Sequence, residues 1–121
     1  MQLANLLNAD LYSSGHGSPV KHVSLTAAAP TYSMKVTDHI IIAVSSEADG
    51  TGIVYLPPVS EAAGRFYYIS APTGATAGDI SLYIKETGAE LATNGDMDAD
   101  GDHILLFSDG YNWRTVYDGV A

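Results

Sequence analysis

The sequence predicts an all-β protein: a single compact β-sandwich or barrel with an extended N-terminal arm. Two observations support this class. From Thr37 onward, short apolar runs alternate with turn signals at the spacing of small β-domains. Nowhere do apolar residues recur at helical spacing over three turns. A chain of 121 residues has the size of one domain with a core of its own. We therefore expect an arm over residues 1–36 and a β-domain over residues 37–121.

The expected arm is rich in Gly, Pro, Ser and Ala, which interrupt regular structure. Its one strand candidate runs from Val20 to Thr26. Stretched out, thirty-odd residues reach on the order of 100 Å, so the arm is expected to contact a neighbouring molecule. Two alternatives stay open, a disordered tail and an edge strand folded back on its own domain. The apolar arm residues expected to make the contacts are Leu3, Leu6, Leu7, Tyr12, Val23, Leu25 and Tyr32.

Within the domain, six strands are expected at about 39–45, 52–56, 65–71, 80–85, 103–108 and 111–117. Pro57 ends the second strand because proline cannot donate to a ladder. Residues 60–64 are the one expected helical turn. The run Ile80–Lys85 alternates apolar and polar residues, which predicts one buried face. The run Ile40–Val44 lacks this alternation, which predicts a strand covered on both faces.

The last two strands flank Asp109-Gly110, a strong short-range hairpin signal. The final strand carries Trp113, the single Trp of the chain, and it lies almost at the C-terminus. A strand in that position is ordered only where neighbours tie it down. Trp113 is therefore expected either in the core or at an interface.

The charge of the chain excludes some partners. Asp and Glu number 14 against five Lys and Arg, which gives a formal net charge of −9. Neutralisation of phosphates by cationic side chains is the main source of nucleic-acid affinity, so neither nucleic acid nor an anionic membrane is an expected partner. The N-terminus lacks the basic flank of a signal peptide and the length of a membrane span. The absence of Cys excludes disulfides and thiol nucleophiles.

An acidic loop precedes the fifth expected strand. Asp96, Asp98 and Asp100 alternate before Gly101, like the first half of a calcium-binding loop. Phe107 stands where such a loop needs a bidentate Glu, so an EF-hand is excluded. A looser calcium site that also includes Asp102 and a solvated acidic turn remain the two interpretations. No other cofactor is expected.

No pattern of catalytic residues is found. The four His, at positions 16, 22, 39 and 103, lack the spacing of zinc ligands. There is no Gly-x-Ser-x-Gly elbow for a nucleophilic Ser, and Gly15-x-Gly17-Ser18 lacks the Lys of a phosphate-binding loop. We therefore do not expect an enzyme.

The run from Asp38 to Val116 resembles small β-domains of tailed-bacteriophage virion proteins, which serve as head decoration proteins, head fibres or tail-fibre tips. The resemblance is carried by an aliphatic first strand, by Gly52-Ile53-Val54-Tyr55-Leu56-Pro57, by Gly64 before an aromatic strand, and by Ser108-Asp109-Gly110-Tyr111-Asn112-Trp113. It covers about two thirds of the chain and implies a homotrimer without catalysis. Fibre members usually follow a long stalk, whereas only a short arm precedes this domain, which favours head decoration.

The resulting expectation is a trimeric capsid decoration (cement) protein on the outer surface of the virion capsid, bridging subunits of the major capsid protein. The alternative is a receptor- or glycan-binding tip domain of a tail fibre. Aromatic residues are enriched at interfaces, although core packing and cross-strand pairs are the commoner explanation for each residue taken singly. The residues expected at the trimer or capsid interface are Tyr67, Tyr68, Tyr111, Trp113 and Tyr117.

Overall fold

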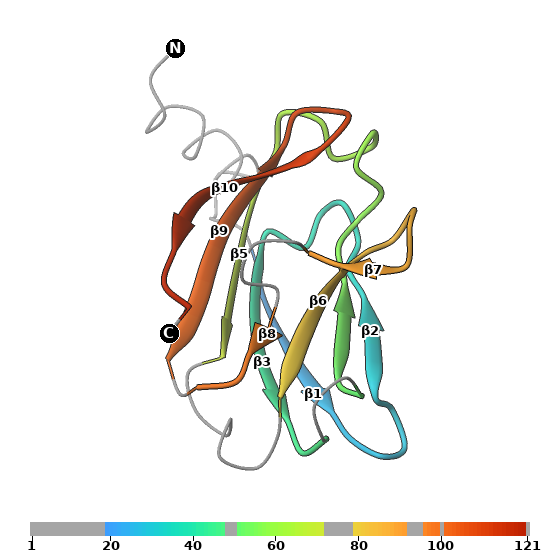
Figure 1. Cartoon of the computed structure of the whole chain (residues 1–121), viewed down its shortest axis with the longest axis vertical. Coiled ribbons are helices and arrows are strands. Elements are labelled where there is room, and N and C mark those ends of the chain that lie inside the picture. The colour runs from blue at the N-terminus through green and yellow to red at the C-terminus, as the bar shows by residue number, and fades with distance from the viewer. Residues whose placement is uncertain (1–18, 48–50, 72–78, 92–95, 100, 121) are drawn as a thin grey trace.

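Two β-sheets packed against each other form the protein in the computed structural model, which describes residues 19–47, 51–71, 79–91, 96–99 and 101–120 (Figure 1). Sheet A has the strand order β1-β3-β5-β9-β10, and sheet B has the order β2-β4-β6-β7, with β8 also paired to β6. This arrangement confirms the all-β sandwich. The strands are β1 (Val20–Leu25), β2 (Thr31–Ser33), β3 (Ile40–Ser45), β4 (Ile53–Tyr55), β5 (Phe66–Ala71), β6 (Ile80–Ile84), β7 (Ala89–Glu90), β8 (Asp96–Met97), β9 (Asp102–Ser108) and β10 (Trp113–Asp118).

The first six strands alternate between the two sheets. Each of β1 to β4 pairs in parallel with the strand two places further along the chain, so that β1, β3 and β5 adjoin in sheet A and β2, β4 and β6 adjoin in sheet B. Parallel neighbours need a crossover connection, and here each crossover is a strand of the opposite sheet. The chain therefore winds like a coil, and the antiparallel strands β7 to β10 complete both sheets.

The core lies between the sheets, where one face of the central strands β3, β5, β9, β4 and β6 is buried. Strand β9 shows the pattern most clearly, because Ile104 and Leu106 are fully buried while Leu105 and Phe107 on the other face are half-buried. This is the period of two expected of a strand with one covered face. The largest fully buried side chains are Tyr67, Leu25, Ile41, Leu56, Ile69, Leu82, Met97, Ile104 and Leu106.

The six strands expected from the sequence are all present, with ends shifted by one or two residues. The terminal hairpin is confirmed, with β9 antiparallel to β10 and with Gly110 at a φ of 94° in the left-handed region that favours glycine. In the expected helical turn, the N–H groups of Glu61 and Ala62 both donate to the Pro58 carbonyl. That turn therefore begins two residues earlier than expected.

Two expectations about burial were wrong. Strand β3 is not covered on both faces, because Val44 is 37% exposed and Ile40 and Ile42 are only half-buried. Apolar residues on both faces of a strand do not require two buried faces. In β6, Ser81 is fully buried although it alternates with the core residues Ile80 and Leu82.

The second half of the expected arm belongs to the folded domain, which corrects the prediction. Residues 20–25 form β1, which pairs in parallel with β3, and residues 31–33 form β2 in the opposite sheet. Val23, Leu25 and Met34 are buried in the core. The open alternative of an edge strand folded back on the domain therefore holds for β1, since burying its inner apolar face outweighs extension into solvent. Residues 1–18, with Leu3, Leu6, Leu7 and Tyr12, lie outside the described residues. Within the described residues, no helix has the length and apolarity needed to cross a membrane.

Candidate functional site

The outer face of sheet A is unusually apolar for the surface of an acidic protein. The inward residues of β3, β5 and β9 are buried, and the pairing register extends the same alternation to β1 and β10, so the alternating residues form this face. The apolar and aromatic residues of the outer face of sheet A, among the described strands, are Val20, Ile40, Ile42, Val44, Phe66, Tyr68, Leu105, Phe107 and Tyr117. Phe66 is buried, the others are half-buried or exposed, and Val20 and Tyr117 are 49% and 59% exposed.

No carboxylate of the described strands lies on this face. The two acidic residues of sheet A are Asp102, which is fully buried, and Asp118, which pairs with the inward Ile104. The charged or ionisable groups on the face are His22, His103 and Arg114. In contrast, the outer side of sheet B carries Glu90 and Asp96 in its strands, placed there by pairing with Tyr83 and Ser81.

Aromatic rings form a row across the outer face of sheet A. The His103 ring stacks on Tyr117 with centroids 5.6 Å apart and lies 6.1 Å from the ring of Tyr68. His103 Nδ1 is 2.8 Å from the carbonyl oxygen of Gly101, which restrains the ring. A Cβ at Gly119 would lie 2.2 Å from His103 Nε2, so only glycine leaves room for this arrangement.

A second aromatic group lies in the core and corrects one predicted interface residue. Tyr67 is fully buried, its O–H donates to the Val36 carbonyl, and its ring stacks on His39 with centroids 5.0 Å apart. Trp113 is half-buried and meets Tyr67 edge to face at 5.6 Å. Tyr67 is therefore a core residue. A central strand buries every second side chain, which explains why the aromatic run 66–68 does not lie on one surface.

The tip of the β9–β10 hairpin lines a small pocket, which we call the tip pocket. Its volume is about 140 Å³. Val59, Ile84 and Trp113 are half-buried, whereas the other lining residues are exposed. Tyr111 is 87% exposed, the highest value among the large hydrophobic residues described as exposed. The tip pocket is lined by Val59, Ile84, Glu86, Thr87, Tyr111, Asn112 and Trp113.

Asp109 organises the hairpin tip. Its Oδ1 accepts hydrogen bonds from the backbone N–H of Asn112 at 2.6 Å and of Tyr111 at 2.8 Å, and its Oδ2 accepts one from Arg114 Nε at 2.8 Å. These contacts, led by the Asn112 N–H, lower the pKa of Asp109 from 3.8 to about 2. Ser108 Oγ accepts from the Gly110 N–H and donates to the Val59 carbonyl. The turn is thereby fixed both to itself and to the opposite wall of the tip pocket.

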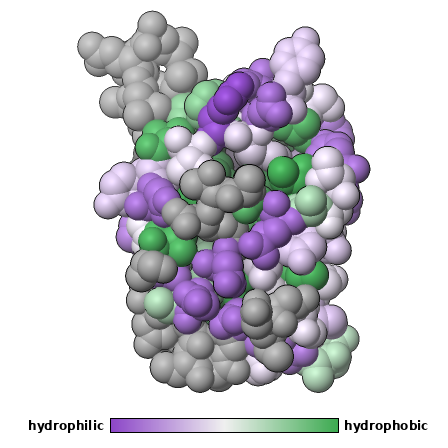
Figure 2. All heavy atoms as spheres, in the orientation of Figure 1, coloured by the Kyte–Doolittle hydropathy of each residue, from purple (hydrophilic) through white to green (hydrophobic). Residues whose placement is uncertain are grey.

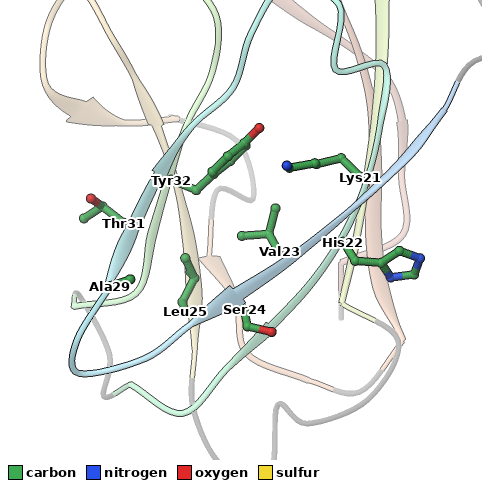
Figure 3. A pocket seen from close by; sticks show the side chains of 8 residues that line it. All are labelled: Lys21, His22, Val23, Ser24, Leu25, Ala29, Thr31 and Tyr32. Atoms are coloured by element: carbon green, nitrogen blue, oxygen red, sulfur yellow. The ribbon is translucent and has the colours of Figure 1, made fainter.

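A second pocket, of about 210 Å³, lies between the edge strands β1 and β2 (Figure 3). Lys21, Val23 and Leu25 point toward the Tyr32 side of the pocket, whereas His22 points away. Lys21 Nζ lies 5.7 Å from the centre of the Tyr32 ring, and the Tyr32 O–H donates to Asp38 Oδ2 at 2.6 Å. Burial, followed by this hydrogen bond, raises the pKa of Tyr32 to about 12. The Lys21 ammonium and the Tyr32 ring thus face each other at the rim of this pocket.

The acidic loop does not assemble as a metal site in the part of the chain that the structure describes. Asp102 is fully buried, and its Oδ2 accepts the Ala99 N–H at 3.0 Å, which closes a turn. Asp98 is exposed and Asp96 is half-buried. Among the described residues, no group of three or more His, Asp or Glu could hold a metal ion, and Asp100 lies outside them. Asp102 therefore acts as a buried turn residue.

The remaining predicted residues are separated in space. Tyr68 and Tyr117 lie on the outer face of sheet A, Tyr111 and Trp113 line the tip pocket, and Tyr32 lines the pocket between β1 and β2. Val23 and Leu25 are core residues that form the floor of this second pocket, and they do not make the arm contacts expected of them.

Sequence reasoning missed the outer face of sheet A, although its signal was present. Runs such as Ile40–Val44 and Ile104–Phe107 are apolar on both faces, more than a single core requires. In Figure 2, hydrophilic side chains are interspersed with isolated hydrophobic ones, which is usual for the surface of a folded domain.

Comparisons with protein-family models, curated proteins and solved structures found no match to this chain.

Proposed function

We propose that the protein is a non-enzymatic structural protein of a tailed-bacteriophage virion: a trimeric decoration protein that binds the outside of the head and contacts the major capsid protein. In this proposal the outer face of sheet A makes the contacts between copies. The resemblance of residues 38–116 to small virion β-domains supports the class of protein. The composition of the outer face of sheet A supports its use in assembly.

The observation that carries the proposal is the absence of carboxylates from the described strands of that face. In a chain with a net charge of −9, two copies meet there without opposing negative charges. Burying a single Val, Ile, Leu or Phe side chain that was exposed contributes about 1.5–3 kcal/mol. Each half-buried side chain of this face contributes part of that free energy to association when a second copy covers it.

The size of the face favours several small contacts over one large one. Five strands about 4.8 Å apart and about six residues long cover on the order of 20 by 20 Å. That is on the order of 400 Å², whereas a stable pair of proteins usually buries about 800 Å² on each partner. In a closed ring of three copies, each copy contacts two neighbours, so two small contacts hold it in place. A trimer that attaches to a capsid at several points also binds more tightly than any one of those contacts alone.

The absolute mass of the full-length protein in solution, measured by light scattering, tests the assembly. We expect the mass of three chains for the natural sequence and a lower mass for Ile42→Glu, which places a carboxylate on the outer face of sheet A. Ile53→Glu is the matched control, because Ile53 is a half-buried Ile on the outer side of sheet B, and it should keep the natural mass. A single-chain mass at all concentrations for the natural protein contradicts the proposal.

Location on the virion needs a second measurement. Protein added to DNA-filled heads that lack decoration should sediment with the heads, and Ile42→Glu should sediment less than Ile53→Glu. Binding to isolated tails but not to heads would place the protein on the tail and reject the decoration role.

A further inference from the structure

We propose that the tip pocket binds one ring of a neutral hexopyranose. This inference is independent of the assembly through sheet A, because the tip pocket lies at the end of the β9–β10 hairpin and shares no residue with the outer face of sheet A. Three segments distant in sequence, around Val59, Ile84–Thr87 and Tyr111–Trp113, meet to form it.

The size of the pocket suits one face of a six-membered ring, with the hydroxyls of the other face in solvent, because most of the lining residues are exposed. An engineered cavity of about 150 Å³ in another protein holds one benzene molecule, and the tip pocket measures about 140 Å³. The half-buried side chains of Val59, Ile84 and Trp113 supply apolar surface. A pyranose has C–H groups on its ring faces, and aromatic and aliphatic side chains are suitable partners for them.

The exposed lining residues supply the groups that hydroxyls need. The Asn112 side chain provides amide donors and an acceptor, Thr87 a hydroxyl, and Glu86 a carboxylate. Glu86 Oε2 accepts the Val59 N–H at 2.7 Å, which holds the carboxylate at the rim. Specific polar groups around an apolar floor are the usual composition of a small-molecule site.

The charges around the tip pocket favour neutral sugars over acidic ones. Among the residues that the structure describes, the lining contains one carboxylate and no Lys, Arg or His. The two basic residues next to lining residues in sequence are engaged elsewhere: Arg114 is bonded to Asp109, and Lys85 Nζ donates to Ser33 Oγ at 3.0 Å. An acidic sugar would therefore bring its carboxylate beside that of Glu86 without a compensating cation. Neutral hexopyranoses avoid this repulsion.

The tip pocket is also prepared for binding before a ligand arrives. Asp109 fixes the turn that presents Tyr111 and Asn112, and Ser108 joins this turn to the carbonyl of Val59. Ordering a loop on binding reduces affinity, so a turn that is already fixed avoids that loss. The Tyr111 ring is 87% exposed, so burial in the core does not explain its presence there.

Titration of the full-length protein with methyl glycosides, followed by NMR, tests this site. The probes are the methyl pyranosides of glucose, galactose and mannose, with methyl glucuronide as the acidic comparison. We expect at least one neutral probe to shift the single indole N–H resonance, that of Trp113, and the Asn112 side-chain amide, with a Kd on the order of millimolar for so small a ligand. Glucuronide should bind more weakly than the neutral glucoside.

Two substitutions separate a built site from weak surface contact. Tyr111→Ala should weaken binding about three- to tenfold, the range expected for one aromatic contact, and should leave the melting temperature unchanged because Tyr111 is exposed. Tyr55→Ala is the control, a half-buried Tyr on the outer side of sheet B that does not line the tip pocket, and it should bind as the natural protein does. No shift with any neutral probe, equal binding by Tyr111→Ala, or tighter binding of glucuronide would each overturn the proposal.

Discussion

Trp113 meets Tyr67 edge to face, with the ring centroids 5.6 Å apart. This contact joins the C-terminal strand β10 to the centre of sheet A, because Tyr67 is fully buried in β5. It also explains how a strand so close to the end of the chain is held in place. Trp113 therefore contributes to the stability of the sandwich by packing against its core.

Trp113→Ala should lower the free energy of unfolding by about 3 kcal/mol, toward the low end of the range for a large aromatic residue because Trp113 is only half-buried. Urea denaturation, followed by circular dichroism, measures this change. Trp113→Phe should be less harmful, because it keeps an aromatic contact with Tyr67 and removes a buried indole N–H that has no hydrogen-bond partner among the described residues. A Trp113→Ala variant of natural stability but lower mass would instead make Trp113 an interface residue.

Leu25→Ala should destabilise the protein by about 2–5 kcal/mol, because Leu25 is 1% exposed and its truncation leaves a cavity. Val20→Ala in the same strand is the control, since Val20 is 49% exposed, and it should change the stability by less than about 1 kcal/mol. Thermal unfolding of the two variants compares them directly. Equal, small effects would show that β1 is not part of the core and would restore the arm first expected for residues 1–36.

Gly119→Ala should displace the His103 ring, since the new Cβ would lie 2.2 Å from His103 Nε2. Movement of the ring disturbs its stacking on Tyr117, so we expect a lower assembled mass with a small change in stability. A double-mutant cycle with His103→Ala isolates the effect. If Gly119→Ala is as harmful without the imidazole as with it, the steric explanation is wrong.

Acid should loosen the hairpin tip. The pKa of Asp109 is lowered to about 2 in the folded protein, so its stabilising contribution is present above pH 4 and is lost as the pH falls from about 4 to about 2. The melting temperature of Asp109→Asn should therefore fall less over this interval than that of the natural protein. Parallel pH profiles for the two proteins would contradict the role given to this carboxylate.

The strands could be predicted from sequence because their signals are local. Apolar runs bounded by Pro57 and by Asp109-Gly110 fix where β4 ends and where the last hairpin turns. The parallel pairing of β1 with β3 could not be predicted, because it depends on contacts twenty residues apart, such as Val20 with Ile40. No local signal distinguishes a parallel from an antiparallel partner.

The candidate sites were predicted only in part, for a related reason. Tyr111 and Trp113 were singled out as aromatic residues, but the other wall of the tip pocket, including Glu86, comes from a segment that only the fold brings close. Tyr67 was expected at an interface and lies in the core, because the sequence does not say which face of β5 is covered. The apolar character of Ile42 and Val44 was recognised, but it was attributed to burial within one chain.

The central claim is that the outer face of sheet A is covered by other copies of this chain. Because the sequence contains no Cys, single substitutions Val44→Cys and Ser33→Cys each introduce one thiol, the first on that face and the second on the exposed outer side of sheet B. Thiol labelling over a dilution series measures the accessibility of each position. We predict that Val44→Cys reacts slowly in concentrated solution and faster on dilution, while Ser33→Cys reacts at one rate throughout. Equal, concentration-independent labelling of both positions would contradict the claim.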